Sequence, residues 1–294
     1  MNYQAPQQTK KSGLFSNLAN PVLRKLQKNG EYESSNAATY AGITSKTLFF
    51  LLATLIGVAA CLLLHKILIT NAAAESLMHY VDTKNGIIDL TFAPAEAIIM
   101  VVVLLISLIT PFLAWLIRPT IPVVGTLYSL AQGFLIGYIT TALAPEYKFI
   151  SLLAMLLTLA LVGGMLFVYA KRIIQVTAKF RGVLMAIFFS LIATGIIYMI
   201  LMLIPGIRNS AFFGNISAFM NTPIVSIGVS ILFVIIASLF MLADFDTIEQ
   251  CVTNQVDKKY EWMAAWGLSY MILYIYFKIL RILLTIFGNR SNSK

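Results

Sequence analysis

The sequence is poor in charged residues. Only 11% of its 294 residues are Asp, Glu, Lys or Arg, whereas 59% are hydrophobic. A soluble globular protein has about 25% charged and about 45–50% apolar residues. The shortage of charge excludes a soluble fold and indicates a polytopic membrane protein. The net charge of +9 therefore does not indicate nucleic-acid binding, because the cations of a membrane protein belong to its cytoplasmic loops.

Cysteine and histidine are also scarce. The two cysteines, Cys61 and Cys251, offer neither a disulfide framework nor a zinc pattern. The two histidines, His65 and His79, are too far apart for the HExxH pattern of a metalloprotease. No nucleophile–base pair is evident either. We therefore do not expect an enzyme, and no cofactor is predicted.

Long apolar runs make up most of the chain. Each is about 20 residues or longer, enough to cross a hydrocarbon core of roughly 30 Å as a helix. The predicted spans are 47–69, 93–117, 120–143, 149–170, 182–204, 223–245 and 262–287. The expected fold is an all-α polytopic membrane protein with seven transmembrane helices.

The two ends of the chain lack such runs. Residues 1–45 are rich in Gln, Asn, Ser and Lys, a composition typical of a largely disordered tail. The first apolar run begins too late and is too long for a signal peptide. The expected domains are a polar N-terminal tail over 1–45, a transmembrane domain over 46–288 and a short C-terminal tail over 289–294.

Lys and Arg predict the orientation. With the N-terminus inside, thirteen of the 21 cations lie on the cytoplasmic side, and the short loops 171–181 and 258–259 are strongly basic. We therefore expect a cell membrane protein with a cytoplasmic N-terminus and an external C-terminus.

The run 120–143 carries a small residue at every fourth position. Small side chains on one helix face let a neighbouring backbone approach closely. Packing is the favoured interpretation of this ridge, which comprises Gly125, Ser129, Gly133, Gly137 and Thr141.

Ionisable residues concentrate in the last two runs. Three carboxylates, Asp244, Asp246 and Glu249, follow one run, and two cations, Lys278 and Arg281, lie inside the next. Ionisable side chains at membrane depth are costly and usually face a bundle interior, a cavity or a partner. These five residues are the candidate site. Solvation at the interface is the alternative for Asp244 and Glu249, and extension to the outer surface is the alternative for Arg281.

The last run has a polar stripe at helical spacing. A lipid-facing helix would not carry such a stripe, so we expect this helix to lie in the centre of the bundle, surrounded by the other six. The stripe consists of Trp266, Tyr270, Tyr274, Lys278, Arg281 and Thr285. If the preceding helix continues to Val256, a pair between Lys278 and Asp246 is within reach.

Three segments resemble the Bax inhibitor/YccA family, in its bacterial branch. They are FDTIEQ (245–250), KKYEWMAAWGL (258–268) and ILYIYFKILRILL (272–284), with weaker matches at 20–25, 128–137 and 176–186. The resemblance implies seven helices with the last one central. It also implies a pH-sensitive calcium leak, closed by a pair of carboxylates on the sixth and seventh helices.

The resemblance assigns the carboxylate of the sixth helix to Asp246. Lys278 stands where the family has the carboxylate of the seventh helix. Two carboxylates that share a site raise one pKa and can switch near neutrality, whereas a lysine favours both charged forms and would hold the contact closed.

Two functions follow as hypotheses. The first is a pH-sensitive calcium leak or ion-flux regulator controlled by Asp246, Lys278, Asp244, Glu249 and Arg281, with transient calcium binding at Asp246 and Glu249. The second is a non-conducting protein that modulates a membrane-bound AAA protease, as the resemblance to YccA implies, and engages it through the N-terminal tail. Expected partners are thus the lipid bilayer, calcium or other cations, and such a protease.

Overall fold

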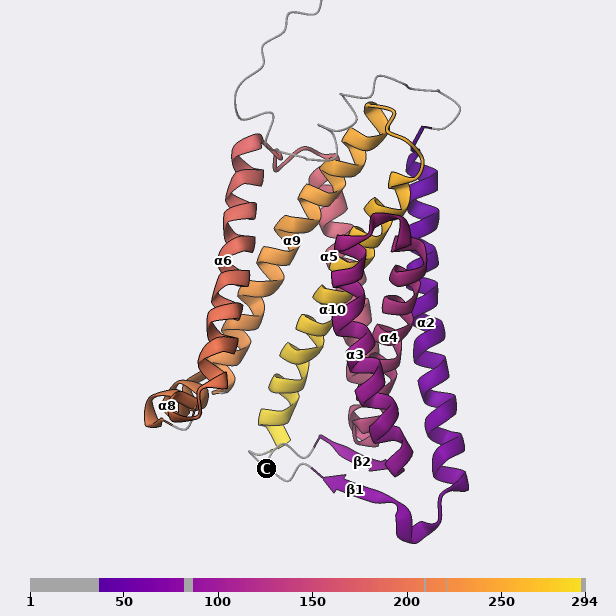
Figure 1. Ribbon diagram of the computed structural model, residues 1–294, viewed down its shortest axis with the longest axis vertical. Coiled ribbons are helices and arrows are strands. Elements are labelled where there is room, and N and C mark those ends of the chain that lie inside the picture. Colours follow the sequence, from indigo (N-terminus) through magenta and orange to yellow (C-terminus); the bar gives the residue numbers. More distant parts are fainter. Residues whose placement is uncertain (1–36, 82–86, 209, 221, 292–294) are drawn as a thin grey trace, which may run out of the picture.

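Seven helices of the computed structural model are long and apolar enough to cross a membrane. The structure describes residues 37–81, 87–208, 210–220 and 222–291. The spans are α2 (Tyr40–Asn71), α3 (Pro94–Leu116), α4 (Ile121–Ala142), α5 (Phe149–Ala170), α6 (Ala178–Leu203), α9 (Pro223–Thr253) and α10 (Tyr260–Ser291). They run along the long axis of the molecule (Figure 1). The predicted all-α membrane fold of seven helices is confirmed.

Four of the spans, α2, α6, α9 and α10, are longer than predicted. The extensions of α2, α6 and α9 bear on the candidate site, and Arg181 lies in that of α6. Helix α9 continues eight residues past the predicted end at 245, so Asp246 and Glu249 lie within a helix. Helix α2 begins at Tyr40, inside the segment expected to be a tail, because the Thr39 side chain accepts a hydrogen bond from the Gly42 amide and caps the helix. Most of the predicted tail, residues 1–36, lies outside the described residues.

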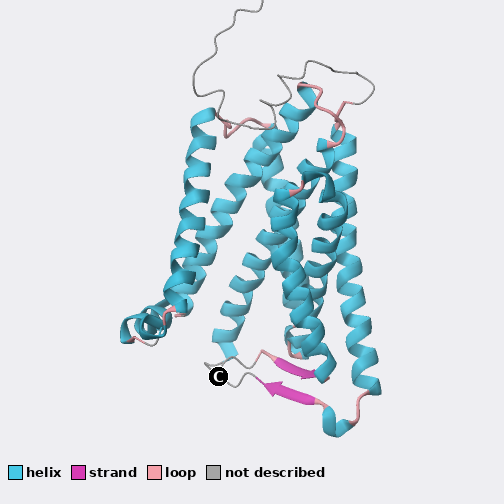
Figure 2. Cartoon of the chain, in the orientation of Figure 1, coloured by secondary structure: helices cyan, strands magenta, loops and turns pink. Residues whose placement is uncertain are grey.

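Several short elements connect the spans. An antiparallel hairpin of β1 (Met78–Val81) and β2 (Asp89–Phe92) lies at the end of the bundle where α10 ends (Figure 2). The remaining elements are the helices α7 (Pro205–Arg208) and α8 (Ala211–Met220) and the 3-10 turns η2 (Ala74–Ser76), η3 (Arg118–Thr120) and η4 (Pro145–Tyr147).

Helix α10 forms the centre of the core. It packs against α9, α2, α5 and α4. Its buried face contributes Ile275, Tyr276 and Leu280, which meet Met241 and Leu242 of α9 in one cluster. The expected central helix is present. Among the spans, however, α3 packs mainly on α4 and α6 mainly on α9, so α10 is not enclosed by all six other spans. The polar stripe is only partly buried. The most buried face of α10 carries mainly aliphatic side chains, which leave fewer polar atoms unsatisfied.

The glycine ridge of α4 packs against α2, as predicted. A Cβ atom added at Gly133 would lie 1.9 Å from the carbonyl oxygen of Thr54, and one added at Gly137 would lie 2.7 Å from Cβ of Cys61. Gly57 of α2 meets the ridge from the other side, since a Cβ there would lie 2.2 Å from the Leu130 carbonyl oxygen. The two backbones touch because neither helix has a side chain at the crossing.

Candidate functional site

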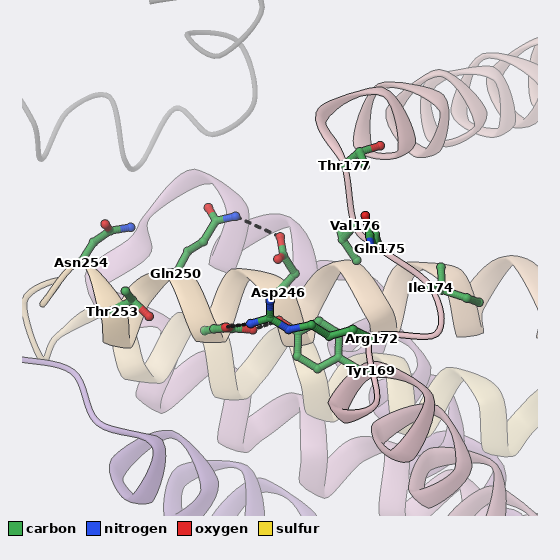
Figure 3. Close-up of a pocket in the computed structure, with 11 residues that line it drawn as sticks. Tyr169, Arg172, Ile174, Gln175, Val176, Thr177, Asp246, Gln250, Thr253 and Asn254 are labelled. Atoms are coloured by element: carbon green, nitrogen blue, oxygen red, sulfur yellow. Dashed lines mark hydrogen bonds and ion pairs between the residues drawn. The ribbon is translucent and has the colours of Figure 1, made fainter. Parts of the chain in front are cut away.

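A cavity of about 550 Å³ lies at the end of the bundle where α9 finishes and α10 begins. One wall comes from the last turns of α9, and the other from the end of α5 and the connection to α6 (Figure 3). Two of the predicted site residues line it. The eleven lining residues are Tyr169, Arg172, Ile174, Gln175, Val176, Thr177, Asp246, Glu249, Gln250, Thr253 and Asn254.

Asp246 is paired with Arg181, in the first turn of the neighbouring helix α6. The Asp246 carboxylate forms an ion pair with Arg181, and only 19% and 14% of the two side chains are exposed. Gln250, one turn further along α9, donates a hydrogen bond of 2.9 Å to Oδ2 of Asp246. Figure 3 shows this amide reaching toward the carboxylate. Asp246 therefore links two spans, α6 and α9.

The predicted pair between Asp246 and Lys278 is wrong. Asp246 lies seven residues before the end of α9, about 10 Å along the helix axis, whereas Lys278 lies 18 residues into α10, about 27 Å from its start. The extension of α9 to Thr253 does not close this difference of about 17 Å, which exceeds the reach of a lysine side chain. Arg181 lies near the start of α6, so its guanidinium is at the same depth as the Asp246 carboxylate.

Glu249 binds two groups from the other wall of the cavity. The hydroxyl of Tyr169, at the end of α5, donates a hydrogen bond to Oε2 of Glu249. Nη2 of Arg172 lies 3.6 Å from Oε1 of the same carboxylate. Arg172 has a φ of 52°, in the left-handed region, where the chain reverses after α5. This turn places the guanidinium beside Tyr169 (Figure 3).

Asp244 is separate from these contacts. It lies two residues before Asp246 on α9 and is not among the residues that line the cavity. Its Oδ2 atom is buried and, within the described part of the chain, has no hydrogen-bond partner. An unsatisfied buried carboxylate oxygen is costly, so the position of Asp244 is an unfavourable one for its charged form.

Lys278 and Arg281 lie in the other half of the bundle, where they contact α9. The ammonium of Lys278 lies 4.4 Å from the ring centre of Phe233 and 5.2 Å from that of Tyr274. Nη2 of Arg281 lies 3.4 Å from Oγ of Ser226. Cation–π contacts stabilise a desolvated ammonium without a carboxylate. The five predicted residues thus do not form one site. Asp246 and Glu249 line the cavity, Asp244 is apart from it, and Lys278 and Arg281 lie in the other half of the bundle.

The carboxylates offer an incomplete site for calcium. Asp246 and Glu249 are one helical turn apart, and Ca²⁺ takes six to eight oxygen ligands. Across residues 37–81, 87–208, 210–220 and 222–291, no group of three or more His, Cys, Asp or Glu side chains could hold a metal ion. Transient calcium binding by Asp246 and Glu249 stays a prediction, for which water and Gln250 would have to supply further oxygens.

A second buried ion pair was missed at the start of α10. Glu261 is fully buried, and its Oε1 atom accepts a hydrogen bond of 2.9 Å from the Thr39 amide. Its Oε2 atom pairs with Nζ of Lys46, whose ammonium also lies 5.3 Å from the ring centre of Trp262. Glu261 therefore fastens the start of α2 to the start of α10. One signal for this contact was present in the sequence: Glu261 is an acidic residue directly before the apolar run 262–287.

Arg181 was counted in the sequence only as a cytoplasmic loop cation. The signal for its role is its position four residues after the helix-capping Thr177, at the start of an apolar run. That position makes Arg181 part of the helix rather than of the loop, so its guanidinium lies within the bundle.

The whole chain was compared with known proteins. A family model described as Bax inhibitor 1 like matches residues 20–288. No match was found among curated proteins or among solved structures. The match covers all seven spans, including the FDT segment of α9 that carries Asp246. The chain therefore belongs to the Bax inhibitor 1 like family.

Proposed function

We propose that this protein is a pH-sensitive cation leak, with calcium as the expected ion, and that the contact between Asp246 and Arg181 keeps it closed. The observation that carries the proposal is this ion pair at the wall of a cavity lined by two carboxylates. Carboxylates at the mouth of a pathway raise the local concentration of cations. The family to which the chain belongs, and the resemblance noted in the sequence, support an ion-flux function.

Helix α6 is the span best able to move. Leu184 is its one buried residue among those described, and its contacts with other spans are mainly with α9. A helix with so few buried apolar contacts has a low cost of displacement. Separation of α6 from α9 would break the ion pair and draw the connection before α6, which forms part of one cavity wall, away from α9.

Acid is expected to favour the open state. Protonation of Asp246 removes its charge and leaves Arg181 without an anionic partner. Loss of one partner from a buried ion pair is strongly unfavourable, so the closed contact weakens as the pH falls. Because Arg181 favours the charged form of Asp246, the leak should stay low near neutral pH and rise only at acidic pH.

Calcium flux into proteoliposomes tests the proposal. Purified protein is reconstituted with a calcium-sensitive dye inside, and entry is followed between about pH 3.5 and pH 8, a range that extends below the ordinary aspartate pKa of about 3.9. We expect flux above that of protein-free liposomes, increasing as the pH falls. Flux equal to that of protein-free liposomes at every pH would overturn the proposal. It would favour instead a non-conducting protein that modulates a membrane-bound AAA protease.

A further inference from the structure

A second cavity, of about 350 Å³, lies between the turn that joins α3 to α4 and the start of α10. Both segments belong to the end of the bundle that holds Asp246 and Glu261 (Figure 1). The volume is within the range of small-ligand pockets, roughly 300–1,000 Å³. This cavity shares no residue with the one that contains Asp246.

The cavity has a cationic rim. Arg118 lies in the three-residue turn η3 between two spans, and Lys259 immediately precedes the span that begins at Tyr260. Both side chains line the cavity. Arg118 is exposed and forms no ion pair with a carboxylate in the part of the chain that the structure describes. A guanidinium offers paired donors that match the oxygens of a phosphate.

The inner part of the cavity is apolar. Ile121, Pro122 and Met263 line it, and Ile121 belongs to a small core cluster that Met263 and Trp262 cover. Tyr260 and Trp262 complete the wall, at the level where α10 enters its span. Tyr and Trp are enriched at the interface between lipid and water, where one part of the ring is apolar and the other is hydrated.

We propose that this cavity binds an anionic phospholipid, with the phosphate between Arg118 and Lys259 and the start of an acyl chain against Ile121 and Met263. Charge complementarity and position favour this occupant. The cations lie at the ends of spans, where lipid headgroups lie, and basic pockets beside transmembrane helices bind such headgroups. A soluble anion would leave the apolar part of the cavity unused. This inference does not depend on the proposed leak.

Asp257 competes with the lipid for Lys259. Its Oδ2 atom lies 2.8 Å from Nζ of Lys259, and Oδ1 accepts a hydrogen bond of 3.0 Å from the Lys259 amide. The hydrogen bond from the lysine side chain is the main cause that lowers the pKa of Asp257, so the carboxylate is charged at neutral pH. Replacement of Asp257 by Asn keeps an acceptor for the amide and releases the ammonium. Asp257→Asn should therefore tighten lipid binding, whereas a general loss of folding would weaken it.

Native mass spectrometry of the full chain in a neutral detergent tests the proposal, with phosphatidylglycerol and phosphatidylcholine titrated separately. Each juxtamembrane cation contributes about five-fold to binding of anionic lipid. We expect Arg118→Gln with Lys259→Gln to weaken phosphatidylglycerol binding roughly 25-fold. The matched control is Lys171→Gln with Lys179→Gln, which removes two exposed cations at the same end of the bundle without touching the cavity. This control should stay within about two-fold of the native protein.

Three results would overturn the proposal. Equal weakening by the two double variants would show attraction to a basic surface without a site. Equal binding of phosphatidylglycerol and phosphatidylcholine would show that the negative charge of the lipid does not contribute to binding. Full competition by glycerol phosphate, which has the headgroup chemistry and no acyl chain, would identify a site for a soluble anion. If the double variant does not fold, tighter binding by Asp257→Asn supports the proposal and unchanged binding contradicts it.

Discussion

Asp246, Glu249 and Glu261 share one arrangement, in which a carboxylate on α9 or α10 pairs with a cation from another element. Arg181 of α6 pairs with Asp246. Arg172, in the connection after α5, pairs with Glu249, and Lys46 of α2 pairs with Glu261. A carboxylate at the end of a span is costly unless it is paired. These pairs therefore determine which helix ends stay together at this side of the bundle.

Loss of the Glu261 carboxylate should destabilise the protein. Glu261→Gln removes the charge that balances Lys46 in a fully buried position and weakens the contact with Thr39. Removal of one partner of a buried ion pair costs about 3–5 kcal/mol, so we expect a loss near the lower end of that range because glutamine keeps one acceptor. Thermal unfolding in detergent measures it. The control is Glu146→Gln at an exposed position, and an equal loss in both variants would contradict the buried role of Glu261.

The position of the candidate site could be predicted at the residue scale, but not its pairing. FDTIEQ and the low charge of the chain identified Asp246 and Glu249 as unusual. The partner could not be identified, because Arg172, Arg181 and Lys278 all lie in segments that the spacing allows to approach α9. Only the depth of each cation along its helix distinguishes them, and that depth depends on where α6, α9 and α10 begin and end.

At the scale of elements, the α2–α4 crossing depends on the absence of side chains. Gly133→Leu would place a side chain against the Thr54 carbonyl and force the two backbones apart. Overpacking of this kind costs about 1–3 kcal/mol or more, and we expect a lower melting temperature in detergent. Gly164→Leu is the matched control, because a Cβ there has nothing within 4 Å. Equal melting temperatures for Gly133→Leu and the native protein would contradict the crossing.

The spans could be predicted because each is a long apolar run, and membrane depth fixes its length. The extension of α9 was harder to predict, since its last two turns carry charged residues that also suit a loop. The hairpin of β1 and β2 gave no usable signal. Its strands have four residues each, too few for an alternating pattern to stand out.

At the scale of the whole molecule, seven spans place the two ends of the described chain on opposite sides. The start of α2 and the end of α10 lie at opposite ends of the bundle (Figure 1). The basic loops predict that the N-terminal side is cytoplasmic. Reporter fusions at residues 5 and 292 should therefore report the cytoplasm and the exterior, respectively. Both reporters in one compartment would contradict the count of spans, and the reverse assignment would contradict the orientation.

The central claim is that Arg181, rather than Lys278, holds Asp246 and keeps the leak closed. Calcium flux at neutral pH, measured for Arg181→Gln and Lys278→Gln in parallel proteoliposomes, tests it most directly. A loss of roughly 1.4 kcal/mol from the closed state raises the open population ten-fold. We therefore predict about ten-fold faster flux for Arg181→Gln, flux within about two-fold of native for Lys278→Gln, and slow flux again when Arg181→Asp is combined with Asp246→Arg. Faster flux for Lys278→Gln with native flux for Arg181→Gln would contradict the claim.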